Sequence, residues 1–133
     1  MATDYTLQVR TWLLSLTGIT GVATVHHNHV PEDKALPYVW FSLSSEQKDN
    51  CLDAAAGEEP VMQLFNIEIC GTSLGGVVAV AKAIKDVCPF RGTLGATTVQ
   101  LCDVDNHDED YVPQNEFSDD VRHIQTLLLR IFP

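Results

Sequence analysis

The segment Gly71-Thr72-Ser73-Leu74-Gly75 matches the G-x-S-x-G motif of serine hydrolases. In that motif the serine stands on the turn between a strand and a helix, and the patterns on either side of this segment supply that context. Ser73 would be the nucleophile, His107 or His123 the general base, and an aspartate between positions 103 and 120 would orient the imidazole. A serine after glycine at the start of a helix is also a common N-cap, and this is the role that we expect for Ser73.

The rest of the chain gives a hydrolase little support. The motif belongs to a largely parallel sheet built from repeated strand–helix–strand units, and this sequence shows at most one such unit. That fold normally needs far more chain than the 133 residues present. The same turn lacks the lysine of a phosphate-binding loop. We therefore expect no catalytic residue and no cofactor, and keep a small esterase using Ser73 as the alternative.

Three histidines near the N-terminus raise the question of a metal site. His27 and His29 would share one face of a strand, with His26 on the other. Together with Glu32 or Asp33 they could hold zinc. Histidines clustered at the end of a strand are more often solvated, so we expect no metal here.

An acidic stretch begins at Asp103 and has the opening pattern of a calcium loop. Asp108 replaces the glycine needed at the sixth position, and Gln114 replaces the glutamate needed at the twelfth. Between Arg91 and Arg122 the chain has eight acidic and no basic residues. We expect a solvated loop over 105–120, with weak calcium binding and a docking surface as alternatives.

Composition limits the remaining classes. The length predicts one domain over residues 1–133, and a 45% hydrophobic content is enough for a core. A net charge of −10 argues against binding nucleic acid through its phosphates, although it suits a surface that DNA slides past. We expect no signal peptide and no membrane span. The four cysteines lack C-x-x-C spacing and are expected to be reduced and structural.

Hydrophobic periodicity predicts two helices, over 4–16 and 73–88. Gly18 should end the first helix. The buried stripe of the second should be Leu74, Val77, Val78, Ala81, Ile84 and Cys88. Alternating apolar residues predict strands, and those at 38–45 and 61–70 should form an antiparallel hairpin. The order is α-β-β-β-α-β-β: an α+β domain with a mostly antiparallel sheet of four to five strands and two helices packed on one face. The predicted strands are 22–28, 38–45, 61–70, 97–104 and 121–132, and the loops are 30–37, 46–60 and 105–120. A helix is the alternative for 121–132, but its Ile, Val, Thr and Phe content favours a strand.

This order and several local patterns resemble the small tail-completion, or tail-terminator, proteins of long-tailed bacteriophages. The resemblance spans nearly the whole chain, although the histidine-rich segment 26–29 departs from it. The matching patterns are Trp12-Leu13-Leu14, Leu36-Pro37-Tyr38-Val39, Phe65-Asn66-Ile67-Glu68-Ile69, Thr72-Ser73 before Ala79-x-Ala81-x-x-Ile84, Asp110-Tyr111, and Thr126-Leu127-Leu128-Leu129-Arg130-Ile131.

The resemblance implies a structural protein that forms a ring, caps the tail tube and helps join the tail to the head. Its partners would be further copies of itself, a tail-tube protein and a head-completion protein, in the virion tail after assembly in the host cytoplasm. A closed ring needs heterologous interfaces, for which edge strands and long loops are the natural places. We expect the interface residues to be Tyr38, Trp40, Glu46, Asp49, Asp53, Glu58, Glu59, Asp108, Glu109 and Asp110.

Overall fold

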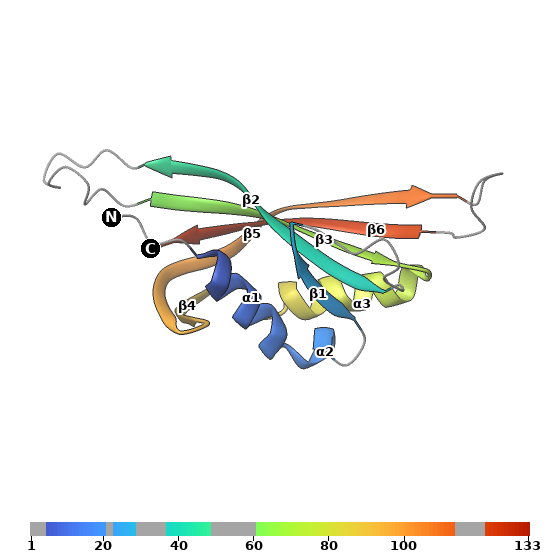
Figure 1. Cartoon of the computed structure of the whole chain (residues 1–133), viewed down its shortest axis with the longest axis horizontal. Coiled ribbons are helices and arrows are strands. Elements are labelled where there is room, and N and C mark those ends of the chain that lie inside the picture. Colours follow the sequence, from blue (N-terminus) through green and yellow to red (C-terminus); the bar gives the residue numbers. More distant parts are fainter. Residues whose placement is uncertain (1–4, 21–22, 29–36, 49–60, 114–121) are drawn as a thin grey trace, which may run out of the picture.

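The computed structural model describes residues 5–20, 23–28, 37–48, 61–113 and 122–133. The helices are α1 (Thr6–Ser15), α2 (Thr17–Thr20) and α3 (Leu74–Lys85). The strands are β1 (Thr24–His27), β2 (Tyr38–Lys48), β3 (Val61–Gly71), β4 (Phe90–Leu94), β5 (Thr97–Val112) and β6 (Arg122–Phe132). They form one sheet in the order β1-β2-β3-β6-β5-β4. The helices lie on one side of this sheet (Figure 1), so the predicted α+β class is confirmed.

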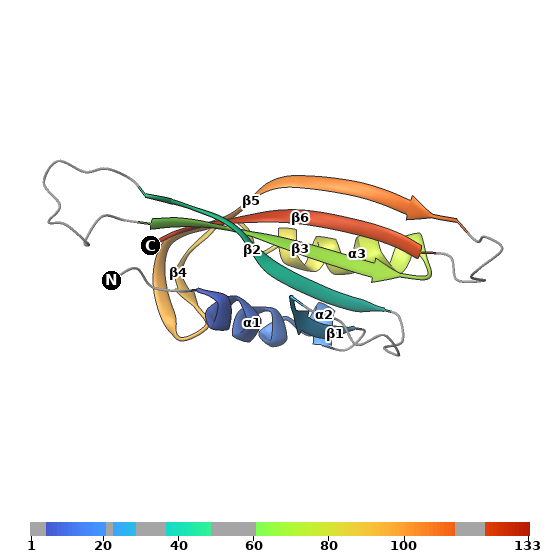
Figure 2. The same cartoon turned by 45° about the horizontal axis from the view of Figure 1, so that its top comes forward.

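Every neighbouring pair of strands is antiparallel except β1 and β2, which are parallel. The predicted hairpin of the second and third strands is confirmed, with Val39 opposite Ile69 and Phe41 opposite Ile67. Figure 2 shows how strongly the sheet twists along its length. The predicted count of four to five strands and two helices is wrong, because the described residues contain six strands and three helices.

The core lies between the helices and the helix-facing side of the sheet. On β3 every second residue from Val61 to Ile69 is buried, and on β6 every second residue from Gln125 to Ile131. This strict alternation is the pattern of a sheet that is covered on one side. On the helices, Val9 and Leu13 of α1 and Ile84 of α3 are fully buried.

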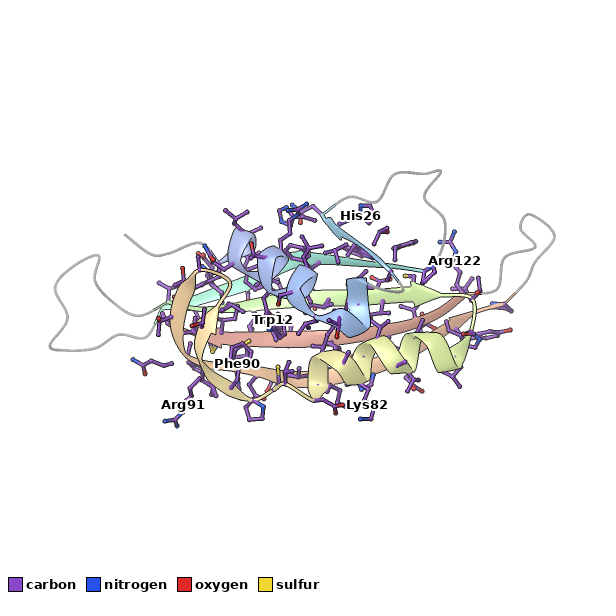
Figure 3. All side chains as sticks on the ribbon, turned by 90° about the horizontal axis from the view of Figure 1, so that it is seen from below. Trp12, His26, Lys82, Phe90, Arg91 and Arg122 are labelled. Atoms are coloured by element: carbon purple, nitrogen blue, oxygen red, sulfur yellow. The ribbon has the colours of Figure 1, made fainter. Side chains whose placement is uncertain are left out.

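The unpredicted strand is β4, which joins β5 through a tight turn at Gly95 and Ala96 and pairs with it. Gly95 has φ +60°, and a Cβ there would lie 3.0 Å from the backbone oxygen of Gln8. The Gln8 side-chain oxygen accepts a 2.8 Å hydrogen bond from the Ala96 amide, which ties the turn to α1. Phe90 packs against Trp12, with ring centroids 5.6 Å apart (Figure 3). Two glycines within six residues concealed this strand in the sequence.

The second correction concerns the acidic segment, which is a strand as far as Val112 and not a loop from position 105. It pairs residue by residue with β6 from Leu101 to Val112, apart from one bulge between Val104 and Asn106. Aspartate has low strand propensity, but an apolar neighbouring strand outweighs it when the charged side chains can stay in water. No calcium-loop geometry can form in an extended strand.

The helices also differ in detail from the prediction. Gly18, expected to end the first helix, lies inside the short helix α2, where a Cβ would stand 2.7 Å from the Cβ of Ala83. Glycine here permits the close approach of α2 and α3. On α3, Leu74 and Val78 were expected in the buried stripe, but they are exposed. The stripe that faces the sheet is Val77, Val80, Ala81 and Ile84.

Candidate assembly surfaces

The side of the sheet that faces away from the helices is covered by no described element (Figure 1). We call it the open face. One register row across it runs through His26, Trp40, Glu68, Thr126 and Asp108. Its half-buried apolar side chains are Tyr38, Trp40, Met62, Leu64, Leu101, Ile124, Leu128 and Phe132.

The predicted aromatic pair, Tyr38 and Trp40, lies on the open face near the β1 margin. The ring of His26 packs edge-on against Tyr38 at 6.4 Å. Burial raises the pKa of the Tyr38 hydroxyl, and the neighbouring thiol of Cys70 raises it further. The Tyr38 ring therefore rests on neighbours within the chain, and both Tyr38 and Trp40 are only half-buried. Such rings are common anchors at protein interfaces.

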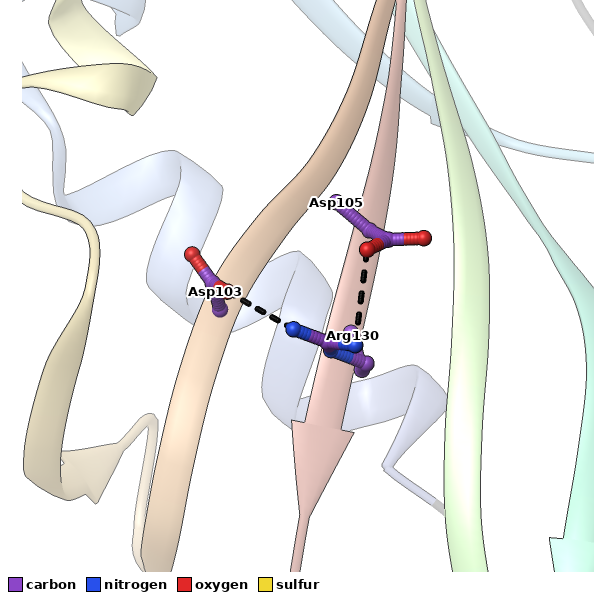
Figure 4. A network of polar contacts seen from close by, with 3 residues as sticks. All are labelled: Asp103, Asp105 and Arg130. Carbon is purple, nitrogen blue, oxygen red and sulfur yellow. Dashed lines mark hydrogen bonds and ion pairs between the residues drawn. The ribbon is translucent and has the colours of Figure 1, made fainter.

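At the other end of the open face, Arg130 holds two carboxylates (Figure 4). Its Nη2 lies 3.0 Å from Asp103 Oδ2, and its Nη1 lies 3.4 Å from Asp105 Oδ1. Asp103 faces Arg130 in the register, and the bulge brings Asp105 beside it as an extra residue. The guanidinium also lies over the ring of Phe132, 5.3 Å from its centroid. The sequence does not predict this cluster, because the position of the bulge cannot be identified from the alternation of residues along the strand. The bulge is what places Asp105 next to Arg130 together with Asp103.

Replacing Arg130 with methionine is expected to lower the free energy of unfolding by about 1–2 kcal/mol. The change removes two partly exposed ion pairs and a cation–π contact, and leaves two nearby carboxylates without their shared cation. Urea unfolding at low and high salt measures the loss, which should shrink as salt rises. Arg122→Met, an exposed arginine on the same strand, is the control. Equal losses in both variants would contradict a specific role for the Arg130 cluster.

Two of the predicted interface residues have partners inside the molecule. Glu46 Oε1 accepts a 3.0 Å hydrogen bond from the buried side chain of Gln63, whose own oxygen accepts from the Tyr5 amide at 3.1 Å. Glu109 Oε1 accepts a 3.0 Å bond from the buried side chain of Gln125. Both carboxylates therefore satisfy buried side-chain amides on the two central strands, β3 and β6.

Gln125 is part of a longer chain of polar contacts beneath β5. Lys85 Nζ lies 3.2 Å from His107 Nδ1, and His107 Nε2 contacts the side-chain oxygen of Gln125. Because ammonium only donates, His107 accepts at Nδ1 and donates from Nε2, and Gln125 then donates to Glu109. In each of these three contacts a donor faces an acceptor. The series of contacts from Lys85 to Glu109 therefore links α3 to the acidic half of β5.

Asp108 and Asp110 are exposed on the open face of β5. Asp108 accepts a hydrogen bond from the Asn106 side chain at 3.0 Å, and Asp110 accepts one from the Tyr111 amide at 2.8 Å. Both bonds are local, so the carboxylates stay available to a partner. The remaining predicted interface residues, Asp49, Asp53, Glu58 and Glu59, lie outside the described residues.

In the part of the chain that the structure describes, Ser73 hydrogen-bonds to neither candidate histidine, although His123 stands opposite Gly71 in the β3–β6 register. Ser73 immediately precedes α3, and its Oγ accepts a 3.1 Å hydrogen bond from the Gly76 amide. His107 is held by Lys85 and Gln125, and the ring of His123 packs on Tyr111 at 4.9 Å. A cavity of about 300 Å³ lies beside Ser73, and its described lining residues include no histidine or carboxylate.

Replacing Ser73 with alanine is expected to cost about 1 kcal/mol of stability and to change no activity. The Gly76 amide would lose the acceptor that satisfies it at the start of α3. Thermal unfolding and hydrolysis of a p-nitrophenyl ester measure the two effects, with Thr72→Ala as the control on the adjacent exposed residue. Ester hydrolysis by the wild type that disappears in Ser73→Ala would overturn the capping role in favour of the esterase.

Metal and membrane sites are not indicated in the described residues. His26 contacts the Thr24 hydroxyl and Tyr38, while His27 packs on Phe41 at 5.0 Å. His29, Glu32 and Asp33 lie outside the described part, within which no three metal-binding side chains gather. Among the described helices, none has the length and apolar character to cross a membrane.

The two margins of the sheet are only partly covered. On one margin β1 pairs with β2 from Tyr38 to Phe41, and no described strand continues that pairing along 42–48. On the other, β4 pairs with β5 as far as Cys102, and no described strand pairs with the outer edge of 103–112. Each margin thus presents unpaired backbone groups among the described residues. These open edges depend on topology, so strand patterns in the sequence alone do not reveal them.

Comparison with known proteins gives a fold likeness. The sequence matches no protein-family model and no curated protein sequence. The structure is similar to a solved chain from the virion of a native gene transfer agent particle, with a TM-score of 0.56 and 19% sequence identity. The match covers 96% of this chain and 90% of that chain, so it extends over the whole fold rather than over one motif.

Proposed function

We propose that this protein is a structural component of a phage-like virion that caps the tail tube and helps join the tail to the head, as a ring of identical subunits. The observation that carries the proposal is the likeness, over nearly the full length of both chains, to a virion protein of a gene transfer agent particle. The tail-completion patterns in the sequence support the same role. The protein would act through its surfaces, without a catalytic residue or a cofactor.

The open edges suggest how a ring is built. They lie on opposite margins of the sheet, at 42–48 of β2 and at 103–112 of β5. An edge of one subunit that pairs with the other edge of the next makes a heterologous contact, which closes into a ring if the rotation is suitable. Backbone hydrogen bonds between strands would provide the affinity.

The remaining surfaces suggest where the other partners bind. The open face with Tyr38 and Trp40 provides an apolar surface for the tail-tube protein. The exposed carboxylates Asp108 and Asp110 stand at the far end of β5. In a chain of net charge −10 they favour a surface that DNA passes without adhering. The head-completion protein would bind the rim of the ring opposite to the one that contacts the tail-tube protein.

Cysteine cross-linking in assembled particles tests the ring. Ser44→Cys on the exposed part of β2 is combined in turn with Asn106→Cys, Asp108→Cys and Asp110→Cys on β5. After oxidation, heterologous pairing predicts a ladder of covalent oligomers larger than a dimer for at least one combination. All variants are made in a chain whose Cys51 and Cys88 are replaced with serine. Each variant with only one of the introduced cysteines is the matched control, because one reactive thiol gives dimers at most. Dimers alone in every combination would contradict the edge-to-edge ring.

A further inference from the structure

Two cysteines meet just after the end of α3, at the last residue of β5 that pairs with β4. Cys88 lies shortly after the last residue of α3. Phe90 follows Cys88 by two residues and stands opposite Cys102 in the β4–β5 register. Cys102 is fully buried, and Cys88 is half-buried and packed against the core. Both thiols are free, and their sulfur atoms are within hydrogen-bonding reach of each other.

Cys88 can be reached from solvent. It lines an open surface hollow of about 310 Å³ between α3 and β5. The charged or titratable groups around this hollow are Lys85, Asp103, Asp105 and His107. A small polar molecule can therefore approach Cys88 through this hollow, while Cys102 stays buried in the core.

The two thiols differ in how readily they ionise. The hydrogen bond donated by Cys102 lowers the pKa of Cys88, against the opposing effects of burial and of the Asp103 carboxylate. The same hydrogen bond and burial raise the pKa of Cys102. Cys88 thus forms the thiolate, which is the nucleophile in thiol–disulfide exchange, and Cys102 keeps its proton until a second step.

We propose that Cys88 and Cys102 form a thiol–disulfide exchange site that a low-molecular-weight disulfide oxidises. The Cys88 thiolate attacks one sulfur of glutathione disulfide, breaks its S–S bond and releases one glutathione thiolate. Cys102 then loses its proton and attacks the Cys88 sulfur, which expels the second glutathione thiolate and forms the Cys88–Cys102 bond. The two protein thiols lose two electrons in total, and glutathione disulfide gains them.

The bond would close a loop that contains β4 and the turn at Gly95. Within that loop, β4 pairs with β5, and the turn between them is hydrogen-bonded to Gln8 of α1. The disulfide would also link the segment after α3 to β5. Restricting this loop in the unfolded chain should stabilise the fold. Cys70 offers a contrast, because burial raises its pKa to about 11 and its nearest polar partners are Glu68 and Tyr38 rather than a thiol.

Peptide mapping of the full chain after incubation with glutathione disulfide tests the proposal. Trypsin cuts after Lys85, Arg91 and Arg122, so Cys88 falls in the peptide 86–91 and Cys102 in the peptide 92–122. The expected product is these two peptides joined, lighter by two hydrogen atoms than their sum and separated by a reductant. The oxidised protein should also unfold at a higher temperature than the reduced protein.

Three variants sharpen the result. In Cys102→Ala the reaction should stop at the first step, with glutathione attached to peptide 86–91, and in Cys88→Ser the peptide 92–122 should stay unmodified. Cys51→Ser is the matched control and should form the cross-link like the wild type. The proposal is overturned if the wild type keeps both thiols free at equilibrium with excess glutathione disulfide. It is also overturned if peptide 86–91 of Cys102→Ala carries no glutathione.

Discussion

Alanine in place of Phe65 is expected to lower the free energy of unfolding by about 3–5 kcal/mol. Phe65 is fully buried on β3, near the centre of the sheet, and its ring lies 6.4 Å from that of Phe41. Removing the ring loses its hydrophobic transfer energy and leaves a cavity that the rigid neighbouring strands cannot close. Urea unfolding followed by the fluorescence of the buried Trp12 measures the change.

Leu64→Ala is the control for this prediction, because Leu64 is the preceding residue on the same strand and points to the open face. Leu64 is half-buried, so its truncation should cost about 1 kcal/mol. The difference between the losses of unfolding free energy in the two variants measures how much more the helix-facing side of the sheet contributes to stability than the open face. Equal losses of unfolding free energy would mean that the open face is as well packed as the helix-facing side in the isolated chain. That would contradict the placement of all described helices on one side of the sheet.

Alanine in place of Trp40 is expected to reduce incorporation of the protein into particles by about 30-fold, with little change in its fold. A tryptophan anchor at an interface contributes on the order of 2 kcal/mol or more to binding, and 2 kcal/mol corresponds to about that factor in a dissociation constant. The ring of Trp40 lies on the open face, where no described helix covers it. Quantitative mass spectrometry of purified particles and of the soluble fraction measures the change.

Leu7→Ala is the matched control, since Leu7 is a large apolar residue on α1 that is 64% exposed on the helical side of the molecule. It should enter particles as the wild type does. Circular dichroism of both purified variants separates a failure to fold from a failure to assemble. A folded Trp40→Ala protein that enters particles at the wild-type level would contradict the assignment of the open face to an interface.

Strong local periodicity is what made much of the fold predictable. The stripe of Val9, Trp12 and Leu13 on α1 and the alternation along β3 each report burial on one side only, so element type follows directly from spacing. The hydrophobic pattern fails where a polar residue occupies a core position because its partners lie on other helices or strands. Gln63 sits at a core position because it satisfies the Tyr5 amide and Glu46, and no spacing rule predicts that.

The acidic half of β5 shows the same limit more strongly. Its sequence resembles a solvated loop, and only pairing with the apolar strand β6 makes it extended. The candidate surfaces are harder still to predict. The open edges follow from which strands happen to be short, and the Arg130 cluster follows from a bulge. The face that Tyr38 and Trp40 occupy could be predicted, because alternation fixes which face of the sheet a strand residue lies on.

Immunogold electron microscopy of the particles released by a producing culture tests the central claim most directly. An antibody against this protein would be applied to intact, purified particles, with particles lacking the gene product as the control. The account predicts gold at a single position on each particle, at the end of the tail that meets the head. Particles that carry no label, while the protein stays in the soluble fraction, would contradict a role as a virion component.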